Sequence, residues 1–221
     1  LKKLIIYGSG KIAKIVYEYL KPHYQIEAFT VEKGFVKEKQ INNLPVVNFE
    51  KIENNLSSKD HYMIIAVGYG EMNKIREQKF KEAKEKGYSF INYIHPSIQT
   101  PDTLEIGENN IILENVTFQP FVKIGNNNFL WSNAVIGHGS VIGDSNWIAS
   151  GTVIAGDTII RSRCFLGINS TVGHNITIKD ENFIGANTLV TKNTSAKDVF
   201  ISKSGEKFRI DSQKFLKFSE T

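Results

Sequence analysis

The feature that most constrains this chain is an apolar side chain that recurs every six residues through its second half. Neither an α-helix, with a period of about 3.6 residues, nor a β-strand, with a period of about 2, produces this spacing. A six-residue period follows when each hexapeptide forms one flat face and one corner, so that three faces close a triangular coil. The series has fifteen members, and none is polar: Ile106, Ile112, Phe118, Ile124, Leu130, Ile136, Ile142, Ile148, Ile154, Ile160, Leu166, Val172, Ile178, Ile184 and Val190.

Two weaker regularities accompany these anchor residues. Glycine often follows an anchor directly, and a small residue or Asn often stands four positions after it. Gly and Asn tolerate the positive φ that we expect at the corners. The glycines are Gly107, Gly125, Gly137, Gly143, Gly167, Gly173 and Gly185, and the second set is Asn110, Asn128, Ala134, Ser140, Asn146, Thr152, Thr158, Cys164, Ser170, Asn182 and Thr188.

The repeat predicts the fold of the second domain. Stacked coils lie at about the spacing of neighbouring strands, roughly 4.8 Å, and the anchors correspond to about five coils of a solenoid. We therefore predict an all-β, left-handed parallel β-helix over residues 96–200, with a different β-solenoid or a β-sandwich as the alternative. The tail, residues 201–221, contains KFRIDSQKFLKF, for which we expect a terminal helix.

The first 95 residues have a different pattern, which is typical of a small Rossmann-like α/β domain. LIIYGSG is a short apolar strand that ends in a glycine turn, and KIAKIVYEYL then shows helical spacing. IEAFTV and HYMIIAVGYG indicate further strands, and NKIREQKFKEAKEKGY indicates a charged amphipathic helix. This β-α-β order predicts a parallel sheet with glycine turns at its carboxyl edge.

Those glycine turns are the predicted substrate-binding residues. Gly8, Ser9, Gly10 and Lys11 form the first turn, and Gly68 lies in the second. Glycines let backbone N–H groups approach a phosphate at the N-terminus of a helix. A lone G-x-G is a weak signal for a nucleotide.

Charge and cysteine content exclude some classes of function. The chain has 27 basic and 23 acidic residues, and they are interspersed rather than clustered. Nucleic-acid binders gather Lys and Arg on one face, so we expect no nucleic-acid partner and favour an anionic small molecule. The single cysteine, Cys164, allows no intramolecular disulfide. With no long apolar segment and no signal peptide, we expect a cytoplasmic protein without membrane insertion.

Together these segments resemble the bacterial sugar acyltransferases of the sialic acid O-acetyltransferase and bacillosamine-pathway N-acetyltransferase type. The resemblance rests on YGSGK, AVGYGEMNKIRE, INYIHPS, AVIGHGSVIGDS and FLGINS, and it covers nearly the whole chain. It implies an acetyl-CoA-dependent transferase that acylates a sugar, acting in surface glycan biosynthesis such as that of lipopolysaccharide or capsule. It also implies a homotrimer with sites between subunits and a nucleotide sugar held by the N-terminal domain.

His138 is the predicted general base. The acceptor amine or hydroxyl must lose a proton as it attacks the thioester, and imidazole, with an ordinary pKa of about 6.5, suits this task. His138, in IGHGSVIG, aligns with the family's base, but Gly139 stands where relatives have an acidic residue or a second His. We expect Asp144 or a backbone carbonyl to orient the ring instead. His174 lies two coils further on, roughly 10 Å away by the stacking distance, too far to pair directly.

The resemblance also implies contacts with the acyl-CoA. Trp147 stands where relatives have a histidine near the thioester. Ile168 and Ala186 match positions whose backbone contacts pantetheine, next to Gly167 and Gly185. Lys192 is a candidate for the CoA phosphates. Ordinary coil filling or a surface lysine is the structural alternative for each.

Some features leave the substrate open. Thr30 and Val31 stand where the family has an acidic pair after the second strand, with Glu32 following, which puts uridine recognition in doubt and argues against NAD. We favour N-acylation of a nucleotide-linked amino sugar over O-acylation of a sialic-acid-like hydroxyl. A non-catalytic trimeric binding protein is the alternative of another class. A metal-dependent hydratase would need three histidine ligands, and the coils offer only His138 and His174, so we expect no metal.

Overall fold

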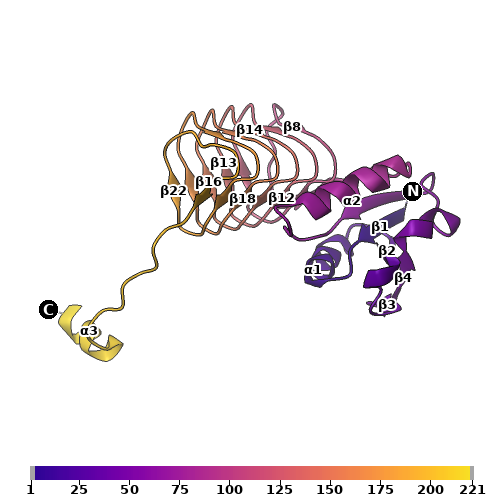
Figure 1. Ribbon diagram of the computed structural model, residues 1–221, viewed down its shortest axis with the longest axis horizontal. Coiled ribbons are helices and arrows are strands. Elements are labelled where there is room, and N and C mark those ends of the chain that lie inside the picture. The colour runs from indigo at the N-terminus through magenta and orange to yellow at the C-terminus, as the bar shows by residue number, and fades with distance from the viewer. Residues whose placement is uncertain (1–2, 220–221) are drawn as a thin grey trace.

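The computed structural model describes residues 3–219, and Figure 1 shows an α/β domain beside a stack of triangular coils, with a tail that leaves the last coil. The N-terminal strands form one six-stranded sheet in the order β3-β4-β2-β1-β5-β6. The strands are β1 (Lys3–Tyr7), β2 (Ile26–Val31), β3 (Gln40–Ile41), β4 (Leu44–Asn48), β5 (His61–Ile65) and β6 (Ser89–Phe90). The helices are α1 (Lys11–Leu20) and α2 (Lys74–Glu85), with 3-10 turns η1 (Lys33–Phe35) and η2 (Phe49–Asn54).

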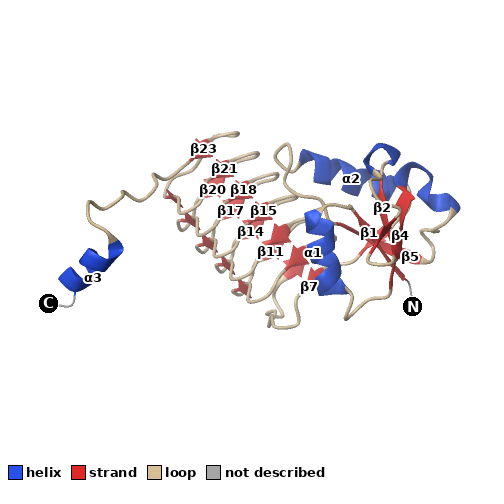
Figure 2. Ribbon diagram, turned by 90° about the horizontal axis from the view of Figure 1, so that it is seen from below, coloured by secondary structure: helices blue, strands red, loops and turns tan. Residues whose placement is uncertain are grey.

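The sheet is parallel except for the β3–β4 hairpin, whose turn residues Asn42 and Asn43 both have positive φ, as a tight hairpin turn requires. The first strand lies in the middle of the sheet, between β2 and β5. From Leu4 to Tyr7 its residues are buried without alternation because α1 covers one side of the sheet and α2 the other (Figure 2). Ala13, Val16 and Leu20 form the buried stripe of α1.

The second domain is the β-helix that the six-residue period predicts. Its three parallel sheets, called here the first, second and third faces, consist of two-residue strands that pair with strands eighteen residues away. The first face contains β10 (Thr117–Phe118), β13 (Val135–Ile136), β16 (Val153–Ile154), β19 (Thr171–Val172) and β22 (Leu189–Val190). The second contains β8 (Glu105–Ile106), β11 (Lys123–Ile124), β14 (Val141–Ile142), β17 (Ile159–Ile160) and β20 (Thr177–Ile178). The third contains β7 (Tyr93–Ile94), β9 (Ile111–Ile112), β12 (Phe129–Leu130), β15 (Trp147–Ile148), β18 (Phe165–Leu166), β21 (Phe183–Ile184) and β23 (Val199–Phe200).

The interior confirms the assignment of the anchors. All of them after Ile106 are buried in one continuous apolar core, and Ile106 packs against its end. The glycines that follow the anchors have a different role from the one expected. The positive φ falls three residues after each anchor from Ile106 to Ile184, and half of these positions are Asn, as at Asn127 and Asn169. Gly107 instead allows close stacking, because a Cβ there would lie 2.7 Å from the Gly125 carbonyl oxygen.

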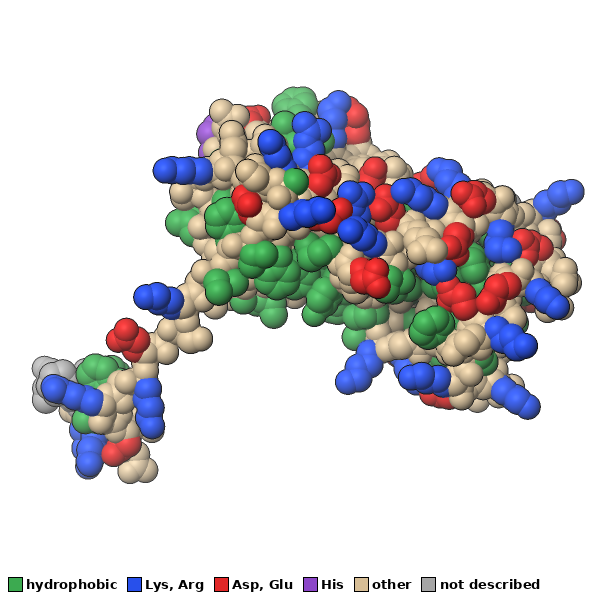
Figure 3. Space-filling model, viewed as in Figure 1, with side chains coloured by type: hydrophobic (Ala, Val, Ile, Leu, Met, Phe, Trp, Pro, Cys, Tyr) green, Lys and Arg blue, Asp and Glu red, His purple; other side chains and the backbone are tan. Residues whose placement is uncertain are grey.

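The outer surface of the third face joins the two domains. Tyr93, Ile111, Phe129 and Trp147 lie one above another on neighbouring strands, and all are buried in a cluster shared with α1 and β1. Further along the stack the coils are uncovered, and Figure 3 shows apolar side chains gathered along one flank of the β-helix. The N-terminal domain is therefore fixed to the third face of the early coils.

After β23 the chain leaves the stack, and the tail carries the short helix α3 (Ser212–Ser219) where the sequence predicts one (Figure 1). Within residues 3–219, none of the helices combines the length and the apolar character that a bilayer span requires.

Candidate functional site

His138 lies on the corner between the first and second faces, in the turn that connects β13 to β14. Its ring Nδ1 is 3.1 Å from Gln119 Oε1, and the same oxygen accepts the His138 backbone N–H at 2.9 Å. A backbone N–H can only donate, so the Gln119 atom must be oxygen and ring Nδ1 must carry the proton that faces it. The neutral ring therefore has its lone pair on Nε2, which is the form that a general base needs.

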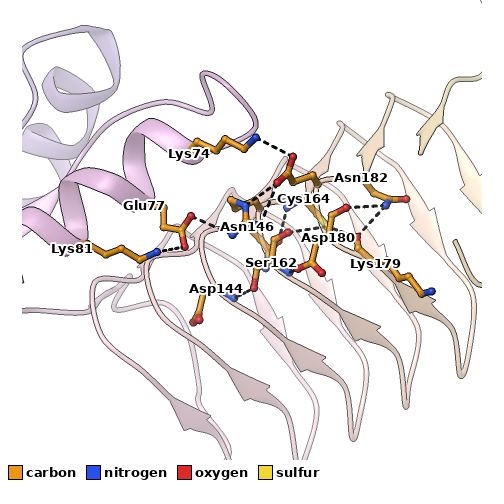
Figure 4. Close-up of polar contacts among 12 residues, drawn as sticks. Lys74, Glu77, Lys81, Asp144, Asn146, Ser162, Cys164, Lys179, Asp180 and Asn182 are labelled. Carbon is orange, nitrogen blue, oxygen red and sulfur yellow. Dashed lines mark hydrogen bonds and ion pairs between the residues drawn. The ribbon is translucent and has the colours of Figure 1, made fainter. Parts of the chain in front are cut away.

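The expectation that Asp144 orients this ring is wrong. Asp144 lies on the corner between the second and third faces, beside α2 (Figure 4). There its carboxylate accepts the backbone N–H of Asn126 at 2.6 Å and the Asn126 side chain at 3.1 Å. Asp144, although close to His138 in sequence, therefore lies on a different corner. Gln119, one coil earlier, orients the His138 ring instead.

His174 lies on the same corner as His138 but closer than the stacking distance suggested. The two ring centroids are 6.4 Å apart because the side chains lean toward each other across the intervening coil. Between them, Asp157 Oδ2 is 3.8 Å from His138 Nε2 and 4.0 Å from His174 Nε2. All three side chains are more than half exposed. Sequence reasoning missed Gln119 and Asp157, although Asp157 lies eighteen residues after Gly139, which is one coil.

A second site lies at the carboxyl edge of the N-terminal sheet. A cleft of about 520 Å³ opens where β1, β2 and β5 end, next to the start of α1. All five predicted substrate-binding residues line it: Gly8, Ser9, Gly10, Lys11 and Gly68. The strand order reverses at β1, and ligands of open α/β sheets bind at such a reversal.

Gly8 shows why the first turn requires glycine. Its φ is +127°, and a Cβ there would lie 2.7 Å from the Ala66 carbonyl oxygen. Gly8 N–H in turn donates to the Thr30 carbonyl at 2.9 Å. Gly10, which precedes α1, has extended backbone and open space around it. The N–H groups of the first turn of α1 therefore face the cleft without a side-chain cap.

The cleft also contains a partly buried acidic group. β2 ends at Val31, so Glu32, which the sequence analysis placed just after Thr30 and Val31, directly follows the strand and lines the cleft. Burial raises the pKa of Glu32, but hydrogen bonds from Lys79 and Tyr7 outweigh it and hold that pKa below its usual range. Burial, with the hydrogen bond to Glu32, raises the pKa of Tyr7 far above its ordinary value.

Helix α2 connects the cleft to the β-helix. Ile75 and Lys79 line the cleft, whereas Arg76 points away from it and is buried against the coils. Arg76 donates to the Asn146 carbonyl and to Asn73 Oδ1, each at 2.9 Å, and burial lowers its pKa to about 9. Asn73 Nδ2 donates to the Cys164 carbonyl at 3.1 Å.

Partly buried ion pairs surround this contact, as Figure 4 shows for Lys74, Glu77 and the coil corners. Lys74 pairs with Glu181, and Arg163 bridges Glu77 and Glu181, each at 3.2 Å. The helix therefore holds the cleft in a fixed position relative to the coils.

Four of the six residues predicted to bind the acyl-CoA lie together on one corner, and Trp147 and Lys192 lie elsewhere. Ile168, 56% exposed, and Ala186 lie on the corner between the third and first faces, with Gly167 and Gly185 buried behind them. Lys192 occupies the register position of His138, three coils further on.

Trp147 differs from the expectation for a cofactor contact. It is 4% exposed, and its ring packs against Tyr69, Phe129 and Arg76 between the domains. Outward positions of the third face at this level are covered by the N-terminal domain, so the side chain has no open surface for a ligand.

The two sites lie on opposite sides of the prism. The cleft belongs to the domain that covers the third face, and the His138 corner is the corner opposite that face. One chain therefore does not bring the histidine to its own cleft. Across residues 3–219, no group of three or more His, Cys, Asp or Glu side chains is arranged to hold a metal ion.

Comparison with known proteins supports the interpretation of the repeat. The family model described as bacterial transferase hexapeptide (six repeats) matches residues 104–138 and 157–192. No curated protein sequence matches the chain.

Solved structures share both domains. The acetyltransferase domain of PglB from Neisseria gonorrhoeae is 21% identical over 90% of this chain and 96% of its own, with a TM-score of 0.80. PerB from Caulobacter crescentus, solved with CoA and GDP-perosamine, is 23% identical over 91% and 92%, with a TM-score of 0.78. WeeI from Acinetobacter baumannii is 19% identical over 90% and 96%, with a TM-score of 0.79. The second domain therefore contains the bacterial transferase hexapeptide repeat, and the chain has the two-domain fold of these structures.

Proposed function

We propose that this protein transfers the acetyl group of acetyl-CoA to the amine of a nucleotide-linked amino sugar used in surface glycans. The observation that carries the proposal is the His138 imidazole, whose Nδ1 is held by Gln119 and whose Nε2 is open on an exposed corner. The fold supports it, since PerB of the same fold was solved with CoA and a nucleotide sugar.

The chemical step follows from the tautomer. The acceptor nitrogen attacks the thioester carbonyl, and Nε2 of His138 takes the proton that the nitrogen loses. The carbon–sulfur bond then breaks, the new amide remains on the sugar, and the leaving thiolate receives the proton as CoA–SH. Gln119 keeps Nδ1–H in place throughout, so the ring accepts and returns a proton at one atom only.

The cleft of the N-terminal domain suits the nucleotide part of the nucleotide-linked amino sugar, which is the acceptor substrate. Uncapped N–H groups at the start of α1 and the Lys11 side chain suit a diphosphate. Ile12, Val31 and Phe35 supply apolar wall for a base. Glu32, already paired with Lys79, is a hydrogen-bond acceptor at the end of β2.

The site requires more than one copy of the chain, and we propose a homotrimer. Within one chain the His138 corner points away from the cleft and is a different corner from that of Ile168 and Ala186. Placing the His138 corner of one copy against the cleft and the Ile168 corner of another would assemble base, nucleotide sugar and pantetheine arm. Light scattering after gel filtration checks the trimer.

The function is tested by thermal shift and by thiol release with acetyl-CoA and UDP-, dTDP- and GDP-linked amino sugars. Stabilisation by one nucleotide sugar together with thiol release supports the proposal and names the substrate. Stabilisation by acetyl-CoA alone points to hydroxyl acceptors such as sialic acids. Absence of turnover with every acceptor, in a trimer that binds ligand, would favour a binding protein instead.

A further inference from the structure

The carboxylate missing after His138 in the sequence is present in space. Asp157 lies one coil after Gly139, and a Cβ built on Gly139 would be 2.3 Å from Asp157 Oδ1. The Asp157 carboxylate thus occupies the room that a side chain at position 139 would need. The absence of a side chain at Gly139 is what allows Asp157 to approach His138.

A second glycine makes room for the ring itself. A Cβ on Gly156 would lie 2.5 Å from His138 Cε1 and 2.6 Å from Nε2, so the imidazole lies directly over the Gly156 backbone. From there Nε2 is 3.8 Å from Asp157 Oδ2. Two glycines, one coil apart, therefore permit an arrangement of ring and carboxylate that larger residues at either position would block.

The distance between ring and carboxylate fits a charge interaction rather than a hydrogen bond. At 3.8 Å the contact is longer than an N–H···O bond, so the Nε2 lone pair stays free for the acceptor. When Nε2 takes the proton, the positive ring lies next to a negative charge at Coulombic range. His174 Nε2 lies on the other side of the same oxygen, at 4.0 Å.

We propose that Asp157 is a positioning residue for His138, which replaces the missing acidic neighbour from the next coil, and that His174 holds the other side of its carboxylate. The inference rests on the proposed function, in which His138 accepts the proton. Asp157 makes and breaks no bond in the step; its charge favours the imidazolium that forms when the acceptor nitrogen is deprotonated.

The first test is Asp157→Asn, which keeps the shape and removes the charge. Because the group is half exposed and screened, we expect kcat to fall roughly tenfold. Both KM values should stay within about twofold, since the substrates do not bind through this carboxylate. His174→Ala should lower kcat less, because it acts only through Asp157. Glu105→Gln, which removes another exposed carboxylate of the β-helix, is the matched control and should leave kcat unchanged.

The second test moves the carboxylate from position 157 to position 139, directly after His138. Asp157→Gly alone should lose as much activity as Asp157→Asn. Adding Gly139→Asp should restore part of kcat, because Asp tolerates the φ of +66° and the obstructing side chain is gone. A merely structural role for Asp157 predicts no such rescue. An unchanged kcat in Asp157→Asn, or a double variant no better than the single one, would overturn the inference.

A readout without substrate separates this inference from the proposed function. The nitrogen-15 shift of His138 Nε2 reports the charge that faces this atom. We expect that shift to change in Asp157→Asn and to stay the same in Glu105→Gln. If the wild-type enzyme released no thiol but this shift changed, the transferase proposal would fail while the Asp157–His138 coupling stood. Turnover with an unchanged shift would overturn the coupling and leave the transferase proposal standing.

Discussion

The two candidate sites of this molecule differ in how completely one chain builds them. The cleft is formed by the ends of three strands and the start of α1, and a tight backbone contact at Gly8 fixes its floor. The His138 corner is an exposed ladder of side chains with open space in front of it. A parallel sheet creates a ligand site at its carboxyl edge from backbone geometry alone, whereas the outer corner of a β-helix needs a neighbouring surface to exclude water. Binding and chemistry should therefore be separable by substitution.

The largest expected effect is on chemistry alone. His138→Ala should lower kcat by about 10²–10⁴-fold, the usual contribution of a general base. Binding of the nucleotide sugar, measured by calorimetry, should not change, because the cleft shares no residue with the corner. His23→Ala, an exposed histidine of the N-terminal domain, is the control. Loss of nucleotide-sugar affinity together with kcat would contradict the separation of the two sites.

The next effect concerns the helix that joins the sites. Arg76→Ala leaves Asn73 Oδ1 without its donor inside a buried contact and removes one of the two donors of the Asn146 carbonyl, which keeps the Phe129 N–H. We expect a loss of about 3 kcal/mol in the free energy of unfolding, measured in urea. Lys74→Ala, on the same helix, removes only the ion pair between a half-exposed lysine and Glu181, and it should cost less than about 1 kcal/mol. Equal effects would mean that the buried guanidinium does not fix the domains.

A smaller effect is expected at the floor of the cleft. Gly8→Ala forces a side chain into a left-handed backbone and against the Ala66 carbonyl, which should cost about 1–3 kcal/mol and weaken nucleotide-sugar binding. Gly10→Ala, two residues away with nothing within 4 Å of its Cβ, should leave stability nearly unchanged. Thermal unfolding of both variants measures this difference in stability. The His138 corner should be unaffected, as seen from its nitrogen-15 ring shifts.

How much of this could be predicted from the sequence depends on the range of the interactions. The fold follows from the anchors, because a six-residue apolar period closes a triangular coil whose strands pair eighteen residues apart. The cleft glycines follow from the strand–turn–helix order. The partners of His138 do not follow from neighbours in sequence, since Gln119 and Asp157 meet it across coils. An eighteen-residue register would have identified Asp157.

The surroundings of Trp147 also differ from those expected of a cofactor contact, for a related reason. Its place in a stack of outward aromatic and aliphatic residues, with Tyr93, Ile111 and Phe129, indicates a covered face rather than a ligand contact. The conformation of the turn before α2 could not be predicted from the sequence. Glu71, Met72 and Asn73 adopt positive φ in succession, and none of them is a glycine that would signal it. The docking of α2 on the coils determines that turn.

The smallest effect tests the other edge of the domain contact, where α1 meets the corner between the third and first faces. Tyr19 donates to Glu114 at 2.9 Å, and burial, together with that hydrogen bond, raises the pKa of Tyr19 to about 12. The unfolded chain ionises Tyr near its ordinary value of about 10. It therefore holds fewer protons than the folded chain between these values, and stability falls as pH rises from about 10 to about 12.

Tyr19→Phe should cost about 1 kcal/mol at neutral pH through the lost hydrogen bond. It should also make unfolding less sensitive to pH above about 10. Urea unfolding at several pH values measures both, with Tyr69→Phe as the control, since Tyr69 is an exposed tyrosine on the other side of the interface. An unchanged alkaline slope in Tyr19→Phe would mean that α1 does not depend on this contact. The N-terminal domain would then be held to the coils chiefly through α2.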